Sequence, residues 1–207
     1  MRSLDLALGC YPASVTRLAR GAQEEGAVAS GAAEARARAL RVRVATRRDA
    51  RVWRALQQGI YDEGSFFVGD GPASEVSLAA RLQFTPRDRA AVWLAERGGL
   101  PVGWCEASRL QAERLEHVAL VTVAVVSGHR RSGVGRALMR EAEGWARGLG
   151  LRKIALHVRG GNVGAIALYR ALGFEVEGVE RAQVRHGGGF EDNLIMAKHL
   201  VPPEAPA

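Results

Sequence analysis

The stretch Val118-Ala-Leu-Val-Thr-Val-Ala-Val-Val-Ser-Gly-His-Arg-Arg-Ser-Gly-Val-Gly-Arg-Ala-Leu-Met139 decides the fold of this chain. Its first part, residues 118–126, is almost wholly apolar and rich in β-branched valine, which predicts a strand covered on both faces. A basic, glycine-rich turn follows and leads into the predicted start of a helix. Glycine lets backbone N–H groups approach an anion closely, and a helix start favours negative charge. We therefore expect a diphosphate cradle formed by Arg130, Arg131, Ser132, Gly133, Val134 and Gly135.

The spacing of the glycines in this cradle excludes two common diphosphate-binding motifs. A P-loop requires G-x-x-x-x-G-K-[ST], and neither Gly-Lys-Ser nor Gly-Lys-Thr occurs in the chain. A dinucleotide-binding turn requires G-x-G-x-x-G, but Leu138 stands where the third glycine would follow Gly133 and Gly135. The pattern that remains is Arg130-x-x-Gly133-x-Gly135. Taken alone, it also fits an ordinary basic turn between a strand and a helix.

A second stretch, Asn162-Val-Gly-Ala-Ile-Ala-Leu-Tyr-Arg-Ala-Leu-Gly-Phe174, follows a predicted buried strand over 153–158. Asn162 is placed to cap a helix over 163–172, and Gly173 is placed to end it. This stretch resembles the motif N-x-x-A-[IL]-x-[LF]-Y-x-x-x-G-F of the GNAT N-acetyltransferase superfamily. The cradle resembles the acetyl-CoA signature [QR]-x-x-G-x-[GA] of the same superfamily. The two signatures lie one helix and one strand apart, as in that superfamily, and the resemblance covers roughly residues 45–200.

The resemblance implies a fold of the α/β (α+β) class, the GNAT fold. Its central sheet is mixed and mostly antiparallel, is flanked by helices, and splays into a V between the strands near 118–126 and 153–158. The pattern of the chain agrees with this expectation. Alternating residues over 39–45 predict a first strand, Thr46 and Asp49 resemble a capping box before a helix, and a hairpin is expected between strands over 90–96 and 102–108.

The resemblance also implies roles for individual residues. The pantetheine chain of acetyl-CoA is expected to pair with the strand backbone near Val123 and Val125, and the pyrophosphate to rest on the cradle. Asn162 matches a position that contacts the cofactor or orders the splayed strands, and Tyr169 matches the tyrosine that protonates the leaving thiolate. His157 stands where relatives that acetylate ribosomal-protein N-termini have a glutamate. A histidine titrates near neutral pH and is therefore a candidate general base, although water alone is the base in many GNAT enzymes.

Residues 60–83 are expected to form a loop and a second helix, and the resemblance implies that this region lines the acceptor pocket. Tyr61, Glu63 and Phe66 are candidates for holding an amine, together with Asp62 and Phe67. The alternative is that the aromatic side chains belong to the core and that the acidic ones are solvated.

Composition predicts one domain with short tails. The chain has 207 residues, 47% of them hydrophobic, which suits a globular domain. We expect the acetyltransferase domain over 39–200, a disordered tail over 1–38 and a frayed tail over 201–207. No apolar run reaches the roughly 18 residues of a membrane span, and two cysteines, Cys10 and Cys105, form no disulfide framework. A cytoplasmic location is therefore expected.

The sequence as a whole predicts an acyltransferase that uses acetyl-CoA as acyl donor and needs no metal. The expected reaction is direct attack by a primary amine, on a small molecule or at a protein N-terminus, in a ternary complex. The alternative is a non-catalytic acyl-CoA-binding or regulatory module. The formal net charge is +7, and almost all of the basic residues are arginine. We do not take this charge as an indication of nucleic-acid binding. No nucleic-acid or membrane partner is expected, and the chain is expected to be a monomer or homodimer.

Overall fold

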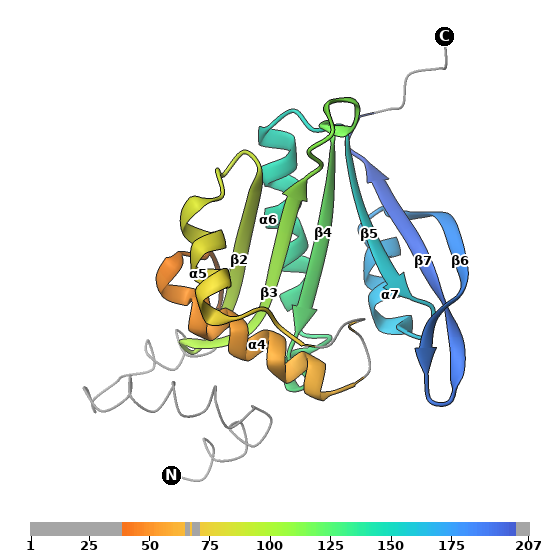
Figure 1. The fold of residues 1–207 in the computed structure, drawn as a ribbon, viewed down its shortest axis with the longest axis horizontal. Helices are drawn as coiled ribbons and strands as arrows, with labels where there is room; N and C mark the ends of the chain where they lie inside the picture. Colours follow the sequence, from red (N-terminus) through yellow and green to blue (C-terminus); the bar gives the residue numbers. More distant parts are fainter. Residues whose placement is uncertain (1–38, 65–66, 68–70, 202–207) are drawn as a thin grey trace. The chain divides into compact units, whose positions relative to one another are not determined.

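The computed structural model describes residues 39–64, 67 and 71–201. The predicted tail over 1–38, most of the predicted tail over 201–207, and Phe66 lie outside these described residues. Seven strands form one sheet in the order β1-β2-β3-β4-β5-β7-β6 (Figure 1). The strands and α-helices, in chain order, are β1 Leu40–Val44, α4 Ala50–Asp62, α5 Glu75–Phe84, β2 Ala90–Arg97, β3 Leu100–Arg109, β4 Val118–Val125, α6 Val134–Gly148, β5 Lys153–Arg159, α7 Val163–Ala171, β6 Glu175–His186 and β7 Gly189–His199.

The chain divides into two compact units, and several strands contribute to both. The first unit consists of Met1–Thr85, Val92–Cys105 and Val123–Leu138, and the second of Pro86–Ala91, Glu106–Thr122 and Met139–Ala207. β1 pairs with β2, and β7 with both β5 and β6, in antiparallel register, whereas β4 and β5 are parallel. This mixed, mostly antiparallel sheet confirms the predicted fold class. Within the described part of the chain, no helix is long and apolar enough to cross a membrane.

In the first unit, α4 begins as the sequence predicts. The capping box between Thr46 and Asp49 is confirmed: the Thr46 N–H donates to the Asp49 carboxylate at 2.8 Å. Arg43 of β1 adds two hydrogen bonds to the same carboxylate, at 2.7 and 2.9 Å. Burial alone would raise the pKa of Asp49, but these bonds from Arg43 and Thr46 outweigh it and hold the pKa below its ordinary value. The charged carboxylate therefore ties β1 to the start of α4.

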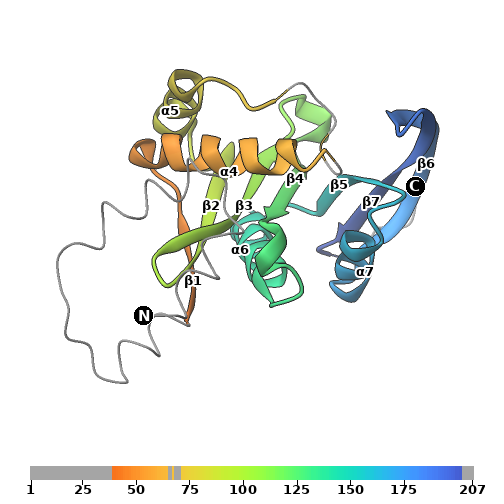
Figure 2. The same ribbon diagram turned by 90° about the horizontal axis from the view of Figure 1, so that it is seen from below.

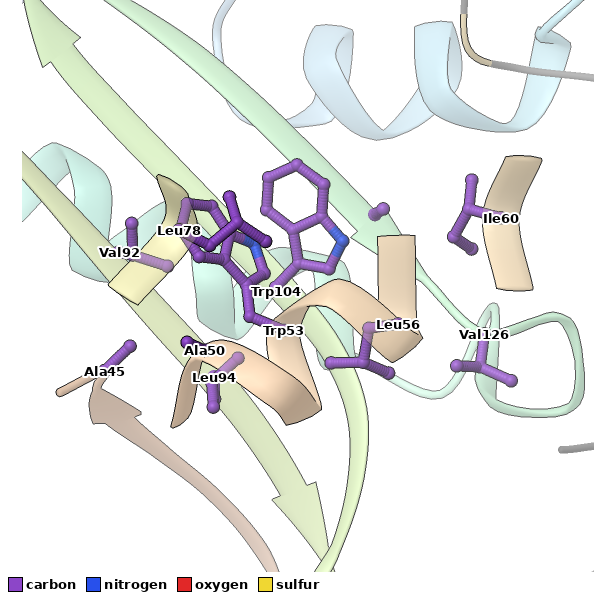
Figure 3. Packing of buried hydrophobic residues seen from close by; sticks show 11 residues of the cluster. Ala45, Ala50, Trp53, Leu56, Ile60, Leu78, Val92, Leu94, Trp104 and Val126 are labelled. Atoms are coloured by element: carbon purple, nitrogen blue, oxygen red, sulfur yellow. The ribbon is translucent and has the colours of Figure 1, made fainter. Parts of the chain in front are cut away.

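The core of the first unit lies between α4 and the sheet. Trp53 and Leu56 of α4 pack with Leu94 of β2 and Trp104 of β3, as Figure 3 shows. The two indole rings meet edge to face, with centroids 5.8 Å apart. On the other face of β3, Gly103 allows a close approach, because a Cβ there would stand 2.7 Å from the Ala124 carbonyl oxygen and 3.3 Å from side chains of α6. α4 and the first turns of α6 thus cover opposite faces of β3 (Figure 2).

The burial of β4 differs from its expected pattern. Leu120 is 40% exposed and Thr122 is also exposed, whereas Ala119 and Val121 are buried. The prediction of a strand covered on both faces is therefore wrong for this part of the strand. Leu120 and Thr122 point to one face of the strand and Ala119 and Val121 to the other, so only one face is covered here. The register with β5 covers only Val118 to Leu120 of β4. This short parallel register agrees with the predicted splay between the two strands.

In the second unit, β7 lies between β5 and β6 and pairs with both in antiparallel register. α7 covers one face of these strands (Figures 1 and 2). The part of α6 in this unit buries Met139, Ala142 and Ala146. Leu149, which directly follows the last residue of the helix, is 36% exposed.

Candidate active site

The predicted cradle follows β4 in the first unit and is a turn with unusual backbone angles. Arg131 has a φ of 57° and Gly133 a φ of 86°, both in the left-handed region. Such angles turn successive N–H groups toward one side and form an anion-binding concavity. A Cβ placed on Gly133 would meet no atom within 4 Å. The space beside Gly133 is therefore open, as a bound phosphate requires.

Hydrogen bonds fix the shape of this turn, and the first backbone amides of α6 lie at its end. The first bond of the helix runs from the Ala137 N–H to the Gly133 carbonyl, at 3.0 Å. The amides of Val134, Gly135 and Arg136 thus precede the helical ladder, where N–H groups lack intrahelical acceptors. The Ser132 hydroxyl donates to the His129 carbonyl at 2.7 Å and so braces the turn.

Positive charge surrounds the cradle. Arg97 of β2 donates to the Ser132 carbonyl at 3.2 Å, which brings a guanidinium to the turn. Burial, and then the charge of Arg97, hold the pKa of His129 below its ordinary value. Arg131 and Arg136 lie in and directly after the turn. This charge and the helix start together favour an anion.

The side chain of Arg130 links two groups that the sequence did not connect. Its Nε donates to the Val125 carbonyl at 2.9 Å, and its guanidinium forms an ion pair with the Glu63 carboxylate just after α4. The cradle is thereby tied both to the end of β4 and to the predicted acceptor region. Tyr61 lies in the same region, with its ring 5.4 Å from Phe67, which stacks on Trp104.

In the second unit, His157 lies in a small polar group on the exposed face of the sheet. Leu156 and Val158 on either side of it are buried, whereas His157 is exposed. The His157 Nδ1 lies 3.2 Å from the Asn193 amide nitrogen and 3.5 Å from the Glu180 carboxylate. The Asn193 amide also donates to Glu180 at 2.6 Å.

The second signature forms the helix that the sequence predicts. Asn162 is the N-cap of α7, because its side-chain oxygen accepts the Ala165 N–H at 3.2 Å. Gly173 ends the helix with a φ of 85°. Tyr169 is buried on α7, and its ring lies 5.8 Å from that of Phe174.

Removal of this cap gives a first test. We expect Asn162→Ala to lower the free energy of unfolding by about 1 kcal/mol, and Asn162→Ser to retain most of it, because a hydroxyl also accepts an N–H at an N-cap. Urea unfolding followed by circular dichroism measures both values. Equal stability of the alanine variant and the wild type would contradict this role of Asn162.

Three residues of the candidate site were missed by sequence reasoning. Arg97 is the last residue of β2 and belongs to neither of the two sequence signatures. Asn193 and Glu180 lie in the last two strands, where only the two polar residues Glu191 and Asn193, two positions apart, hinted at a shared polar face. Among the described residues, no group of three histidine, cysteine, aspartate or glutamate side chains is placed to hold a metal ion.

The comparisons with known proteins agree with both signatures. The model of the Acetyltransferase (GNAT) family matches residues 53–174. The N-alpha-acetyltransferase RimI of Mycobacterium tuberculosis is 33% identical over 126 residues, which are 61% of this chain and 76% of that protein. An aminoglycoside N(6')-acetyltransferase type 1 of Stenotrophomonas maltophilia is 32% identical over 141 residues, which are 65% of this chain and 85% of that protein.

A solved structure shows the same architecture. The ribosomal-protein-alanine N-acetyltransferase of Brucella melitensis is 27% identical, with a TM-score of 0.68 over 77% of this chain and 99% of the other. Sequence family and fold thus point to the same group of enzymes.

Proposed function

This chain belongs to the GNAT acetyltransferase family and is an acetyl-CoA-dependent N-acetyltransferase, and from that premise we propose that it acetylates a primary amine by direct attack in a ternary complex. The observation that carries the proposal is the cradle, where Gly133 and the start of α6 leave open space beside a cluster of positive charge. An enzyme needs both the cradle, which binds the acyl donor, and the second signature, which carries Tyr169. A non-catalytic acyl-CoA-binding module would need only the cradle.

The donor side of the proposed site is the cradle with the strand before it. The amides of Arg131 to Gly135 bind the pyrophosphate, and the arginines around the turn neutralise its charge. The backbone of β4 near Val123 and Val125 pairs with the pantetheine chain. The Arg130 side chain holds this backbone in place through the Val125 carbonyl.

Two residues of the second unit carry the proton transfers. The acceptor amine must be neutral at the moment of attack, and His157 removes its proton through the imidazole Nε2. The leaving thiolate then takes a proton from the Tyr169 phenol. Asn162 supports this part of the site by capping α7, the helix that carries Tyr169.

The acceptor is a primary amine, and the relatives suggest two sources for it. The RimI and ribosomal-protein-alanine relatives favour a protein N-terminus, whereas the aminoglycoside relative favours a small molecule. We propose that Tyr61 and Phe66 contact the acceptor. Glu63 adds negative charge there, which it shares with Arg130.

A transfer assay tests this proposal. The protein is incubated with acetyl-CoA and either a peptide that begins with alanine or an aminoglycoside. We expect one acetylated amine by mass spectrometry for each CoA thiol released with at least one of these acceptors. The same peptide with a blocked N-terminus is the matched control and should not react. Release of CoA with no acetylated amine from either acceptor would overturn the proposal.

A further inference from the structure

We propose that Glu180 binds a second positive charge on the acceptor, so that the enzyme prefers amines that carry another cation close to the amine that is acetylated. This inference deepens the function proposed above and rests on it, because that function brings the acceptor amine to His157. Glu180 is a substrate-binding residue in this proposal and takes no part in the proton transfers.

The strand register places Glu180 beside His157 within the second unit. β5 pairs His157 with Ile195 of β7. β6 pairs Glu180 with Asn193 of β7. Paired residues of antiparallel strands share a face, and so do residues two apart on one strand, so these four side chains lie on the same face. The Glu180 Oε2 is 3.5 Å from the His157 Nδ1. An acceptor at the imidazole therefore comes close to this carboxylate.

One oxygen of the Glu180 carboxylate is held by the protein, and the other is open. The Oε2 accepts a hydrogen bond of 2.6 Å from the amide of Asn193, which is itself only 8% exposed. The Oε1 makes no hydrogen bond with any other residue in the part of the chain that the structure describes. A carboxylate oxygen only accepts, so this open oxygen suits an N–H group of a bound ligand.

The negative charge of Glu180 is not cancelled by a permanent cation. Three neighbouring carboxylates are each paired with a lysine or an arginine: Glu177 with Lys153, Glu191 with Arg159 and Asp192 with Arg181. Among the described residues, Glu180 has no such partner, and its contact with His157 balances charge only when that ring is protonated. A cation on the acceptor therefore finds an available negative charge here.

A bulge directly after Glu180 fixes the strand at this point. Three residues of β6, 181–183, stand opposite Asp192 of β7. Ala182 has a φ of 49°, in the left-handed region that alanine rarely adopts. The Asp192 Oδ1 accepts the Ala182 N–H at 2.9 Å and supports this conformation. Bulges beside active sites re-aim side chains, and this one together with Asn193 holds the Glu180 carboxylate in place.

The ligand group that fits is an ammonium or a guanidinium a few ångströms from the reacting amine. Both groups donate N–H bonds to a carboxylate oxygen. The attraction is weakened by water, because the Glu180 side chain is 32% exposed. A peptide that begins with alanine and continues with lysine carries both groups. Its terminal amine is the acceptor, and the lysine ammonium is the group for Glu180.

The test compares three peptides that begin with alanine and differ only at the second residue, which is lysine, methionine or glutamate. Wild type should acetylate the lysine peptide with a kcat/KM about fivefold above that of the methionine peptide, and the glutamate peptide should be poorer again by about fivefold. Glu180→Gln keeps an oxygen for the Asn193 amide and removes the charge, so the three values should converge to within about twofold. The wild-type preference should also shrink as the ionic strength rises.

Glu177→Gln is the matched control. It removes a carboxylate from the same strand whose charge is already shared with Lys153 and His199, and it should keep the wild-type order of the peptides. A thermal melt of each variant confirms the fold. A wild-type enzyme without preference for the lysine peptide, or an unchanged preference in Glu180→Gln, would overturn the proposal.

The outcomes separate this inference from the function beneath it. If wild type acetylates all three peptides equally, the binding role of Glu180 is wrong and the proposed function stands. If wild type acetylates none of them, the proposed function fails for peptides, and calorimetric titration of the CoA complex with the lysine and methionine peptides decides the inference alone. Tighter binding of the lysine peptide that is lost in Glu180→Gln would support it, whereas equal or absent binding would overturn it.

Discussion

Gly133→Glu is expected to weaken acetyl-CoA binding by at least about 100-fold, which corresponds to about 2.7 kcal/mol. The open space beside Gly133 is where the pyrophosphate is proposed to lie. A glutamate there places a side chain and a negative charge in that space and repels the diphosphate. It also forces a φ of 86° on a residue with a Cβ. Isothermal titration calorimetry measures the loss.

Two further variants separate these causes. Gly133→Asn introduces a neutral side chain that tolerates the left-handed region, so its loss of affinity should be smaller than that of the glutamate. Gly144→Glu makes the same change at an exposed position of α6, the helix that follows the cradle. A Cβ there also meets no atom within 4 Å. This variant should bind acetyl-CoA as wild type does. An equal loss in Gly144→Glu would show that the effect is not local to the cradle.

Tyr169→Phe is expected to lower kcat by about 100-fold while the affinity for acetyl-CoA stays within about twofold of wild type, as loss of a general acid predicts. The phenylalanine ring fills the same buried space beside Phe174, so the helix should remain packed. Single-turnover kinetics with the alanine peptide give the rate of the chemical step, and a thermal melt confirms the fold.

Tyr61→Phe is the matched control for this variant, because it removes a phenol from the proposed acceptor side. It should change KM for the acceptor more than kcat. A Tyr169→Phe enzyme with wild-type kcat would exclude the phenol as the acid, and the thiolate would then leave unassisted or with a proton from water.

Local features were predictable from the sequence because each depends on a few neighbouring residues. The capping box at Thr46 and Asp49 and the cap at Asn162 follow from side chains that bond to nearby backbone, and both are confirmed. Gly173 ends α7 for the same kind of reason. The two signatures also led to the correct family, because they combine such local features at a fixed spacing.

Features that depend on the register of strands or on distant contacts were not predictable. The valine-rich strand β4 was expected to be covered on both faces, but Leu120 and Thr122 on one face are exposed. No local pattern shows which face of a strand distant elements will cover. The ion pair of Arg130 with Glu63 joins residues far apart in the chain. The contact of His157 with Asn193 depends on a strand register that a single sequence does not specify.

The titration of the wild-type protein with acetyl-CoA tests the central claim most directly. Calorimetry with acetyl-CoA, CoA, NAD and ATP, each on the same preparation, compares four ligands that carry a diphosphate group. The account predicts that acetyl-CoA and CoA bind with one site per chain and that NAD and ATP bind far more weakly. Binding of NAD or ATP without binding of acetyl-CoA would contradict it.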